Sequence, residues 1–405
     1  MKTKHGLPET VIFCKRCVIS NQRPNTSPEH KKKDSRIGTI GFKDGVCDAC
    51  RYYEMKQTID WQEREEQLVD LLNRHRRNDG GFDVIIPGSG GKDSVFVAHT
   101  LKFKYNMHPL TVTWAPHMYT DIGWRNFQSW LRFGFDNTLV TPNPKVHRIL
   151  TRLAFENLVN PFQPFIIGQK NVAPRAALHY DVPLIMYGEN QAEVHNFLEG
   201  NLSPLMDISH FTRKSDKEQL YYGGVPLEEL SKYGISKQDM YLYIPFLEEQ
   251  IAEKNIEVHF MSYYHNWSPQ DHYYYAKNHS RFQCNPDGRS EGTYTKFSSL
   301  DDRIDGQHYY TTYIKFGQAR AAHDACRDIR DGFITREEGL ALVKKYDGEF
   351  PKRYFQEVLK YMQITEERYW EVIDGARSPH LWEKIGGEWR LKHAVYDEES
   401  EKNVA

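Results

Sequence analysis

A chain of 405 residues exceeds the roughly 250–300 residues at which a single core stops growing, so two or more units are expected. Its net charge of −2 argues against a protein with broad affinity for nucleic acid. No run approaches the ~18 apolar residues of a membrane span, and the N-terminus lacks the apolar core of a signal peptide, so we expect a cytoplasmic protein with no membrane partner.

Four of the six cysteines form two CxxC pairs near the N-terminus: Cys14 and Cys17, then Cys47 and Cys50. Two pairs of soft thiolates favour a tetrahedral all-sulfur site, so we predict structural zinc. The same thiolates can bind an iron–sulfur cluster, and the sequence leaves this alternative open. We therefore expect residues 1–58 to be a zinc-binding module and residues 59–78 to be a connecting helix with one apolar face.

The stretch Asp83–Ser94 is the centre of the next expected unit, residues 79–320. Its apolar run Val84–Ile86 does not alternate with polar residues, which is typical of a buried strand in a parallel sheet. The glycines that follow permit a tight turn, and Val95–Lys104 has helical character. A loop that opens onto a helix N-terminus is an anion-binding site.

The known phosphate loops can be compared with this stretch. A Walker A loop requires glycine and a hydroxyl residue where Ile86 and Asp93 stand, and the dinucleotide fingerprint requires glycine at Asp93. What remains is Ser89-Gly-Gly-Lys-Asp-Ser94, which resembles the SGGxDS loop of the PP-loop ATP pyrophosphatases. The resemblance implies cleavage of ATP between its α- and β-phosphates, with catalytic roles for Lys92 and Asp93 and with magnesium on Asp93. The implied ATP-binding residues of the loop are Pro87, Gly88, Ser89, Gly90, Gly91, Lys92, Asp93 and Ser94.

Three further strands are predicted at residues 110–115, 137–141 and 182–190, with helices between them. This order indicates an α/β fold with a doubly wound parallel sheet, whose ligands bind at the carboxyl ends of the strands. The helical stretch 145–179 is expected to be interrupted at its three prolines, Pro161, Pro164 and Pro174.

Two of these strand ends carry further candidates for ATP binding. The PP-loop resemblance implies that Trp114 lies near the adenine and that Gly188 and Asn190 approach the α-phosphate. Three neighbouring side chains are candidates to face the substrate or a metal: Glu189, Glu193 and His195.

Residues 196–260 are expected to be an insertion, because glycines and prolines break the stretch up. The alternating stretch Tyr309–Gly317 predicts another strand, at whose end Lys315 would reach the ATP phosphates and take part in catalysis. Between them, three histidines are evenly spaced, but Pro269 interrupts any helix that would align them as metal ligands. They are His265, His272 and His279.

Residues 321–405 are expected to be a helical region with a charged tail. The segment 327–338 has the look of a calcium-binding loop, but Arg327 and Ile329 occupy ligand positions and cannot bind calcium. Thr335, with Glu338 three residues later, predicts a capped helix start instead.

Four segments together resemble the N-acetyl sugar amidotransferases of bacterial surface-polysaccharide and flagellin-sugar biosynthesis. They are the cysteine segments 13–24 and 45–54, the loop segment 87–94 and the segment 327–338. The resemblance implies that ATP adenylates the acetamido oxygen of a sugar nucleotide, that ammonia then forms an acetamidino group, and that AMP and pyrophosphate are released. It also implies two partners, a glutaminase and a cyclase-like subunit, which supply the ammonia.

The sequence leaves two other functions open. A tRNA thiolation enzyme of the PP-loop family can join a cysteine-rich module to the same loop, but it requires catalytic cysteines. Only Cys284 and Cys326 lie outside the four-cysteine set, and neither belongs to a CxxC pair. The third alternative is a nucleotide-binding scaffold without activity, which a lack of AMP release would support.

Overall fold

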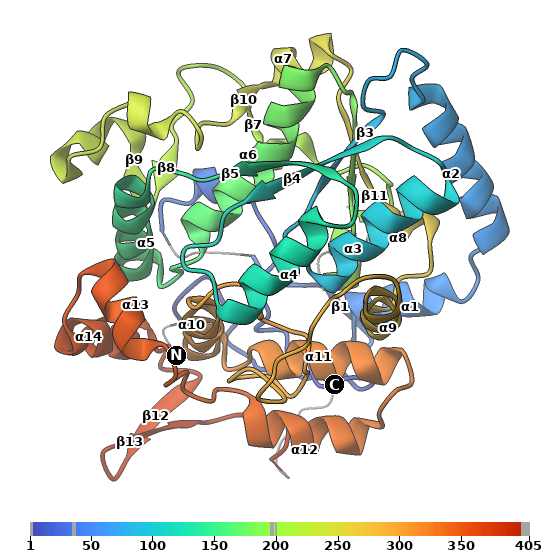
Figure 1. Cartoon of the computed structure of the whole chain (residues 1–405). Helices are drawn as coiled ribbons and strands as arrows, with labels where there is room; N and C mark the ends of the chain where they lie inside the picture. The colour runs from blue at the N-terminus through green and yellow to red at the C-terminus, as the bar shows by residue number, and fades with distance from the viewer. Residues whose placement is uncertain (1–2, 35–37, 195–197, 199–200, 398–405) are drawn as a thin grey trace.

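The computed structural model describes residues 3–34, 38–194, 198 and 201–397. Within these residues, the main sheet has five parallel strands in the order β11-β6-β3-β4-β5 (Figure 1). The strands are β3 (Val84–Pro87), β4 (Pro109–Trp114), β5 (Asp136–Val140), β6 (Leu184–Tyr187) and β11 (Glu257–Phe260). The α/β fold with a parallel sheet that the sequence predicts is confirmed.

Helices cover both faces of this sheet. Val84 and Ile86 of β3 belong to one apolar cluster, and Ile85 between them belongs to the other. Burying an Ile or Val side chain contributes about 1.5–3 kcal/mol, which explains why the strand has no polar alternation. The first face is covered by α2 (Trp61–His75), α3 (Lys92–His99), α4 (Asp121–Leu131) and α9 (Pro269–His279), and the second by α5 (Pro144–Leu158) and α6 (Gln163–Tyr180).

The strand order reverses between β3 and β6. The chain proceeds from β3 to β4 and β5 on one side, and then adds β6 and β11 on the other. β3 and β6 are paired at Ile85 and Ile185. In open parallel sheets, ligands bind at the carboxyl ends of the strands where the order reverses. The loops after β3 and β6 are therefore placed to form the ligand site.

Two predictions of local structure are wrong. The stretch Tyr309–Gly317 is not a strand, because α10 spans Asp305–Phe316. Its buried residues include Thr311, Ile314 and Lys315, which share one helix face, so burial against the rest of the protein overrides the strand propensity of the tyrosines and threonines. Pro174 does not interrupt its helix, since α6 continues through it.

Two elements are missing from the sequence prediction. β11 lies at the end of the stretch 196–260, and it completes the main sheet beside β6. A hairpin of β12 (Trp382–Ile385) and β13 (Glu388–Leu391) lies in the region expected to be helical. Each of these strands has four residues, like β3 and β6, but charged or polar side chains interrupt its apolar residues, so no continuous apolar run marks it in the sequence.

The C-terminal region is otherwise helical, as predicted. It contains α11 (Arg320–Arg330), α12 (Arg336–Tyr346), α13 (Phe355–Met362) and α14 (Glu366–Ala376). Thr335 caps α12 as expected: its hydroxyl accepts a hydrogen bond from Glu338 N at 3.2 Å, and the Glu338 carboxylate accepts one from Thr335 N at 2.7 Å. Among the helices of the described residues, none combines the length and the apolar character needed to cross a membrane.

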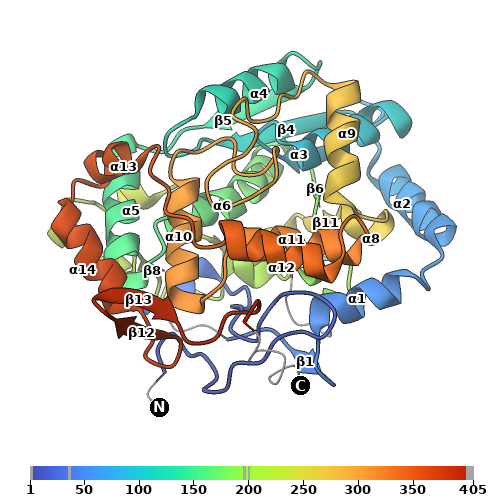
Figure 2. The ribbon, with the colours of Figure 1, turned by 90° about the horizontal axis from the view of Figure 1, so that it is seen from below.

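The cysteine-containing segment packs against α11 and α12. A hairpin of β1 (Phe42–Lys43) and β2 (Val46–Cys47) leads into α1 (Asp48–Lys56). The four cysteines share one apolar cluster with Ala322, Ala325 and Val343. Figure 2 shows α11 and α12 side by side, next to this N-terminal segment. Segments far apart in the sequence thus form one packed layer below the sheet.

Candidate active site

The loop between β3 and α3 has glycine where a side chain would collide. A Cβ on Gly88 would lie 2.5 Å from the Cβ of Ser94, and one on Gly90 would lie 2.7 Å from the carbonyl oxygen of Asn126. Gly90 also has a φ of +84°, which favours glycine. The loop ends at Gly91, the N-cap of α3, where the first N–H groups of the helix lack partners within the helix. This geometry is suited to an anion.

Asp93, in the first turn of α3, is held between two cationic or proton-donating side chains. Lys92 Nζ lies 2.5 Å from one carboxylate oxygen, and His272 Nδ1 of α9 donates to the other at 3.1 Å. Burial opposes ionisation, but the charge of Lys92 and the hydrogen bond from His272 hold the pKa of Asp93 below its ordinary value. The sequence does not identify His272 as a partner of the loop; its ring stacks on Phe96 of α3.

A cavity of about 310 Å³, which we call the loop cavity, opens at the carboxyl ends of β3, β4 and β6. Trp114 lines it, and its indole Nε1 is buried without a hydrogen-bond partner among the described residues. The broad face of an indole at a cavity wall offers an apolar surface for an aromatic ligand. The predicted ATP-binding residues in the lining are Pro87, Gly88, Ser89, Gly91, Asp93, Ser94, Trp114 and Gly188.

Gly168 of α6 sets the position of Trp114. A Cβ on Gly168 would lie 2.1 Å from the indole, so even alanine must displace the ring. We expect Gly168→Ala to lower the free energy of unfolding by about 1–3 kcal/mol through overpacking, and to raise the KM for ATP. Gly375→Ala in α14 is the matched control: nothing lies within 4 Å of its new Cβ, and we expect a gain of about 0.5–1 kcal/mol. Denaturant unfolding measures both, and equal effects of the two substitutions would contradict this account.

Three aspartates near the start of α10 form a wall of the loop cavity that the sequence does not reveal: Asp301, Asp302 and Asp305. Ser89 Oγ donates to Asp301 at 2.8 Å, which ties the loop to a segment 212 residues away. Burial raises the pKa of Asp301, and burial together with its acidic neighbours raises that of Asp305. Carboxylates beside a phosphate loop are the oxygen ligands that magnesium prefers.

The turn after β6 brings a second set of predicted residues to the site. Gly188 lines the loop cavity, and a Cβ there would lie 2.8 Å from the Trp267 ring. Asn190 does not line it: the buried side chain donates to the carbonyl groups of Asn201 and Ser203 and accepts from Ala192 N. Asn190 thus stabilises the turn, and its contact with ATP stays a prediction.

The three side chains expected to face the substrate or a metal have different positions. Glu189 lines the loop cavity, and its Oε1 forms an ion pair with Nη2 of Arg327 in α11 at 3.0 Å. Glu193 pairs instead with buried Lys56 of α1 at 2.9 Å, which joins the cysteine segment to the sheet. His195 lies outside the described residues.

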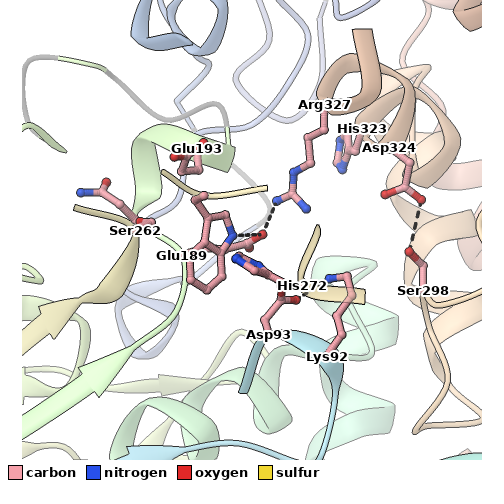
Figure 3. A network of polar contacts seen from close by, with 12 residues as sticks. Lys92, Asp93, Glu189, Glu193, Ser262, His272, Ser298, His323, Asp324 and Arg327 are labelled. Atoms are coloured by element: carbon pink, nitrogen blue, oxygen red, sulfur yellow. Dashed lines mark hydrogen bonds and ion pairs between the residues drawn. The ribbon is translucent and has the colours of Figure 1, made fainter. Parts of the chain in front are cut away.

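A second cavity, of about 480 Å³, adjoins the first, and we call it the helix cavity because α10 and α11 form one wall. The segment around Arg23 and Lys32 contributes another part of the wall. Asp93 and Glu189 line both cavities. Figure 3 shows Arg327 extending from α11 toward Glu189, near His272, Asp93 and Lys92. Two ligands bound in these cavities would meet at Asp93 and Glu189.

Lys92 and Lys315 line the helix cavity and not the loop cavity. Lys315 is buried on α10, and its Nζ donates to the carbonyl oxygen of Leu158 at 3.2 Å. The predicted contact of Lys315 with the ATP phosphates assumed that this segment is a strand, whereas it is α10. The contact itself stays a prediction. Gly90 also lies in the loop without lining either cavity.

The four N-terminal cysteines converge on one buried point. Their sulfur atoms all lie within 4.8 Å of one another, with Cys14 and Cys50 at 3.9 Å and Cys17 and Cys47 at 3.7 Å. The backbone N–H groups of Arg16 and Cys47 point to Cys14 Sγ at 3.4 Å, which is favourable for a thiolate. Among the described residues, this is the one cluster of potential ligands dense enough to hold a metal ion.

The two remaining cysteines have different surroundings. Cys326 of α11 is fully buried in the apolar cluster of the metal-binding cysteines. Cys284 is half-buried, 3.7 Å from the hydroxyl group of Tyr273. Within the described residues, neither lines the loop cavity or the helix cavity.

Comparison with known proteins identifies one part of the chain. Residues 291–396 match the family described as LPS biosynthesis protein WbpG-like, C-terminal domain. This confirms, for these residues, the resemblance to surface-polysaccharide enzymes that the sequence indicates. The matched segment supplies Asp301, Lys315 and Arg327 to the two cavities.

Similarity elsewhere is weak. No curated protein matches the chain. Among solved structures, the U34-tRNA thiolase NcsA from Methanococcus maripaludis, solved with its [4Fe-4S] cluster, has 12% sequence identity and a TM-score of 0.24, over 67% of this chain and 84% of that chain. Such values are too low to indicate a shared activity.

Proposed function

We propose that this chain, which carries the C-terminal domain of the WbpG-like LPS biosynthesis proteins, is an ATP-dependent amidotransferase. Its acceptor is the acetamido group of a sugar nucleotide, which it converts to an acetamidino group. ATP is consumed to AMP and pyrophosphate, and ammonia comes from a glutaminase partner through a cyclase-like subunit.

The observation that carries this proposal is the junction of the two cavities. The loop cavity is lined by four residues of the SGGKDS loop and by Trp114, and it adjoins the helix cavity where Asp93 and Glu189 line both. A reaction that joins ATP to a second substrate requires two adjoining sites, and holding both substrates in place removes much of the entropic cost.

The chemistry assigned to this junction balances without a protein nucleophile. An amide carbon is a poor electrophile because the nitrogen lone pair delocalises onto the carbonyl group. Attack of the amide oxygen on the α-phosphate releases pyrophosphate and creates a leaving group. Ammonia then adds to the carbon and AMP departs with the oxygen. The loop N–H groups and Lys92 would stabilise the phosphate charge, and Asp93 would hold magnesium together with a carboxylate such as Asp301.

For the cysteine cluster we propose structural zinc. With Zn–S bonds of about 2.3 Å, a regular tetrahedron has sulfur atoms about 3.8 Å apart. The sulfur–sulfur distances of 3.9 Å and 3.7 Å fit one ion. A cluster that spreads its irons over several ångströms requires its thiolates to stand farther apart. Four cysteine ligands leave no open position for a substrate.

The decisive assay uses the chain alone, an acetamido sugar nucleotide such as UDP-N-acetylglucosamine, ATP, magnesium and a high concentration of free ammonia. We expect AMP and pyrophosphate in equal amounts, and a product that is slightly lighter than the substrate and carries one more positive charge. Mass spectrometry and ion exchange measure these changes. Stoichiometric ADP would contradict the mechanism, and glutamine should replace ammonia only when a glutaminase is added.

The same assay distinguishes amidination from thiolation. Sulfur transfer through the enzyme requires a reactive cysteine, whereas ammonia does not. We expect the double variant Cys284→Ser, Cys326→Ala to keep most of the activity. Alanine is chosen at Cys326 because serine would place a hydroxyl group in a fully buried apolar site. A variant that is folded and binds ATP but forms no product would favour sulfur chemistry and remove the sugar assignment.

A further inference from the structure

The helix cavity contains a buried lysine, Lys315, that makes no ion pair with the cavity's carboxylates within the described residues. Four of its basic side chains form ion pairs within the cavity wall: Lys32 with Glu29, Lys92 with Asp93, Arg320 with Asp324 and Arg327 with Glu189. Lys315 differs from these four. Within the described residues, no carboxylate lies within ion-pair distance of its Nζ, which makes one hydrogen bond, to the carbonyl oxygen of Leu158.

An ammonium group with one neutral partner is costly to bury. Lys315 is 7% exposed, and a protonated lysine has three N–H donors to satisfy. Burial, together with the charge of Lys32, lowers the pKa of Lys315 to about 7. A fixed anion in the cavity would use the remaining donors and restore the charged form. The unpaired ammonium group of Lys315 therefore indicates that the helix cavity binds an anionic ligand.

We propose that Lys315 binds an anionic group of the acceptor, a phosphate or a carboxylate, and so directs the acceptor's amide toward Asp93 and Glu189. The identity of the ligand as the acceptor rests on the function proposed above. The position of Lys315 supports this role over a contact with ATP, because Lys315 lies on α10, outside the phosphate loop, and lines only the helix cavity, whereas Lys92 belongs to the phosphate loop itself. Lys315 is thus a binding residue for the second substrate.

The test compares Lys315→Met with Lys315→Arg by calorimetric titration, which requires no turnover. Methionine keeps an unbranched side chain of nearly the same length and removes an unpaired buried charge, so the variant should fold at least as stably. Lys170→Met is the matched control: burial also lowers the pKa of Lys170, to about 8, but Lys170 does not line the helix cavity. Thermal unfolding of all three variants checks their folding.

Two acetamido probes separate the possible sources of the anion. UDP-N-acetylglucosamine has a diphosphate and no carboxylate, and N-acetylneuraminic acid has a carboxylate and no phosphate. We expect Lys315→Met to weaken one of them by roughly 10- to 100-fold, the loss typical of a hydrogen bond to a charged group, while Lys315→Arg and Lys170→Met stay close to wild type. The probe affected identifies the source.

The affinity for ATP must not change in Lys315→Met. If ATP binding weakens and probe binding does not, Lys315 belongs to the ATP site and the proposal is overturned. It is also overturned if neither probe distinguishes the methionine variant from wild type. Either result leaves AMP formation by the wild-type chain untouched, so a failure of this inference is separable from a failure of the proposed function.

The pH dependence of probe binding supplies a second readout. The anion binds the protonated lysine, so the wild-type affinity should fall above pH 7, by up to about tenfold per pH unit. The charged and titratable groups that act on Lys315 or feel its charge are Lys32, Glu29, His308 and His5. Lys315→Arg stays charged throughout and should show a flat profile from pH 7 to 9. The same slope in both proteins would assign the titration to another group.

Discussion

Asp93→Asn is expected to reduce the rate of AMP formation by roughly 100-fold or more and to leave the fold intact. The carboxylate is held by Lys92 and His272, and both contacts keep it ionised. Asparagine preserves the shape and removes the charge that we assign to magnesium. The measurement is single-turnover AMP release at saturating magnesium, with thermal unfolding in parallel.

Asp271→Asn is the control for this substitution. Asp271 is an exposed carboxylate of α9 next to His272, and it does not line either cavity. It should keep the wild-type rate within about twofold, because an exposed charge is well screened. If both variants are equally active, Asp93 has no catalytic role, and the assignment of the loop chemistry to this residue is wrong.

Cys17→Ser is expected to unfold or aggregate the cysteine segment. A structural zinc site contributes on the order of 10 kcal/mol of apparent folding free energy, which is comparable to the whole net stability of a typical domain. The cysteines pack directly on Ala322 and Ala325 of α11, so the loss should also release Arg327 from Glu189. Elemental analysis and limited proteolysis measure metal content and unfolding.

Cys284→Ser is the matched control, because Cys284 lies outside the metal cluster. We expect it to bind one zinc ion per chain, the same content that we expect for the wild type. Absence of zinc from the wild-type protein, or visible absorbance from iron, would reject zinc in favour of the iron–sulfur alternative. Full zinc content in Cys17→Ser would show that Cys17 is not a ligand.

The sequence predicts the parts of the fold whose patterns are long or chemically unusual. The apolar strands β3, β4 and β6 alternate with helices, and the glycines of the loop follow β3 directly. The strand prediction for the segment that forms α10 is wrong for a physical reason. Its aromatic and β-branched residues favour a strand locally, but its buried side chains lie on one face of a helix. β11 has the same length as β6, but Glu257 and His259 interrupt its apolar residues, so only its pairing with β6 identifies it as a strand.

The candidate site is predictable only where one stretch of chain contains the signal. The SGGKDS loop is such a stretch, and so are the CxxC pairs. Asp301 and Arg327 cannot be predicted in this way, because they contact Ser89 and Glu189 from more than a hundred residues away in the sequence. The many histidines and tyrosines near His272 in the sequence indicate a densely packed region, but they do not show which ring contacts Asp93.

The bond between Ser89 and Asp301 has a consequence for biosynthesis. At about 5–20 residues per second, the ribosome needs roughly 10–40 s to add the intervening chain. During that time the nascent sheet lacks the aspartate wall of its cavity, and the cysteine segment lacks the helix on which it packs. Native contacts of such separation form late and leave apolar surface exposed. We therefore expect the phosphate loop and the cysteine segment to reach their native packing only after residues 301–330 have been translated.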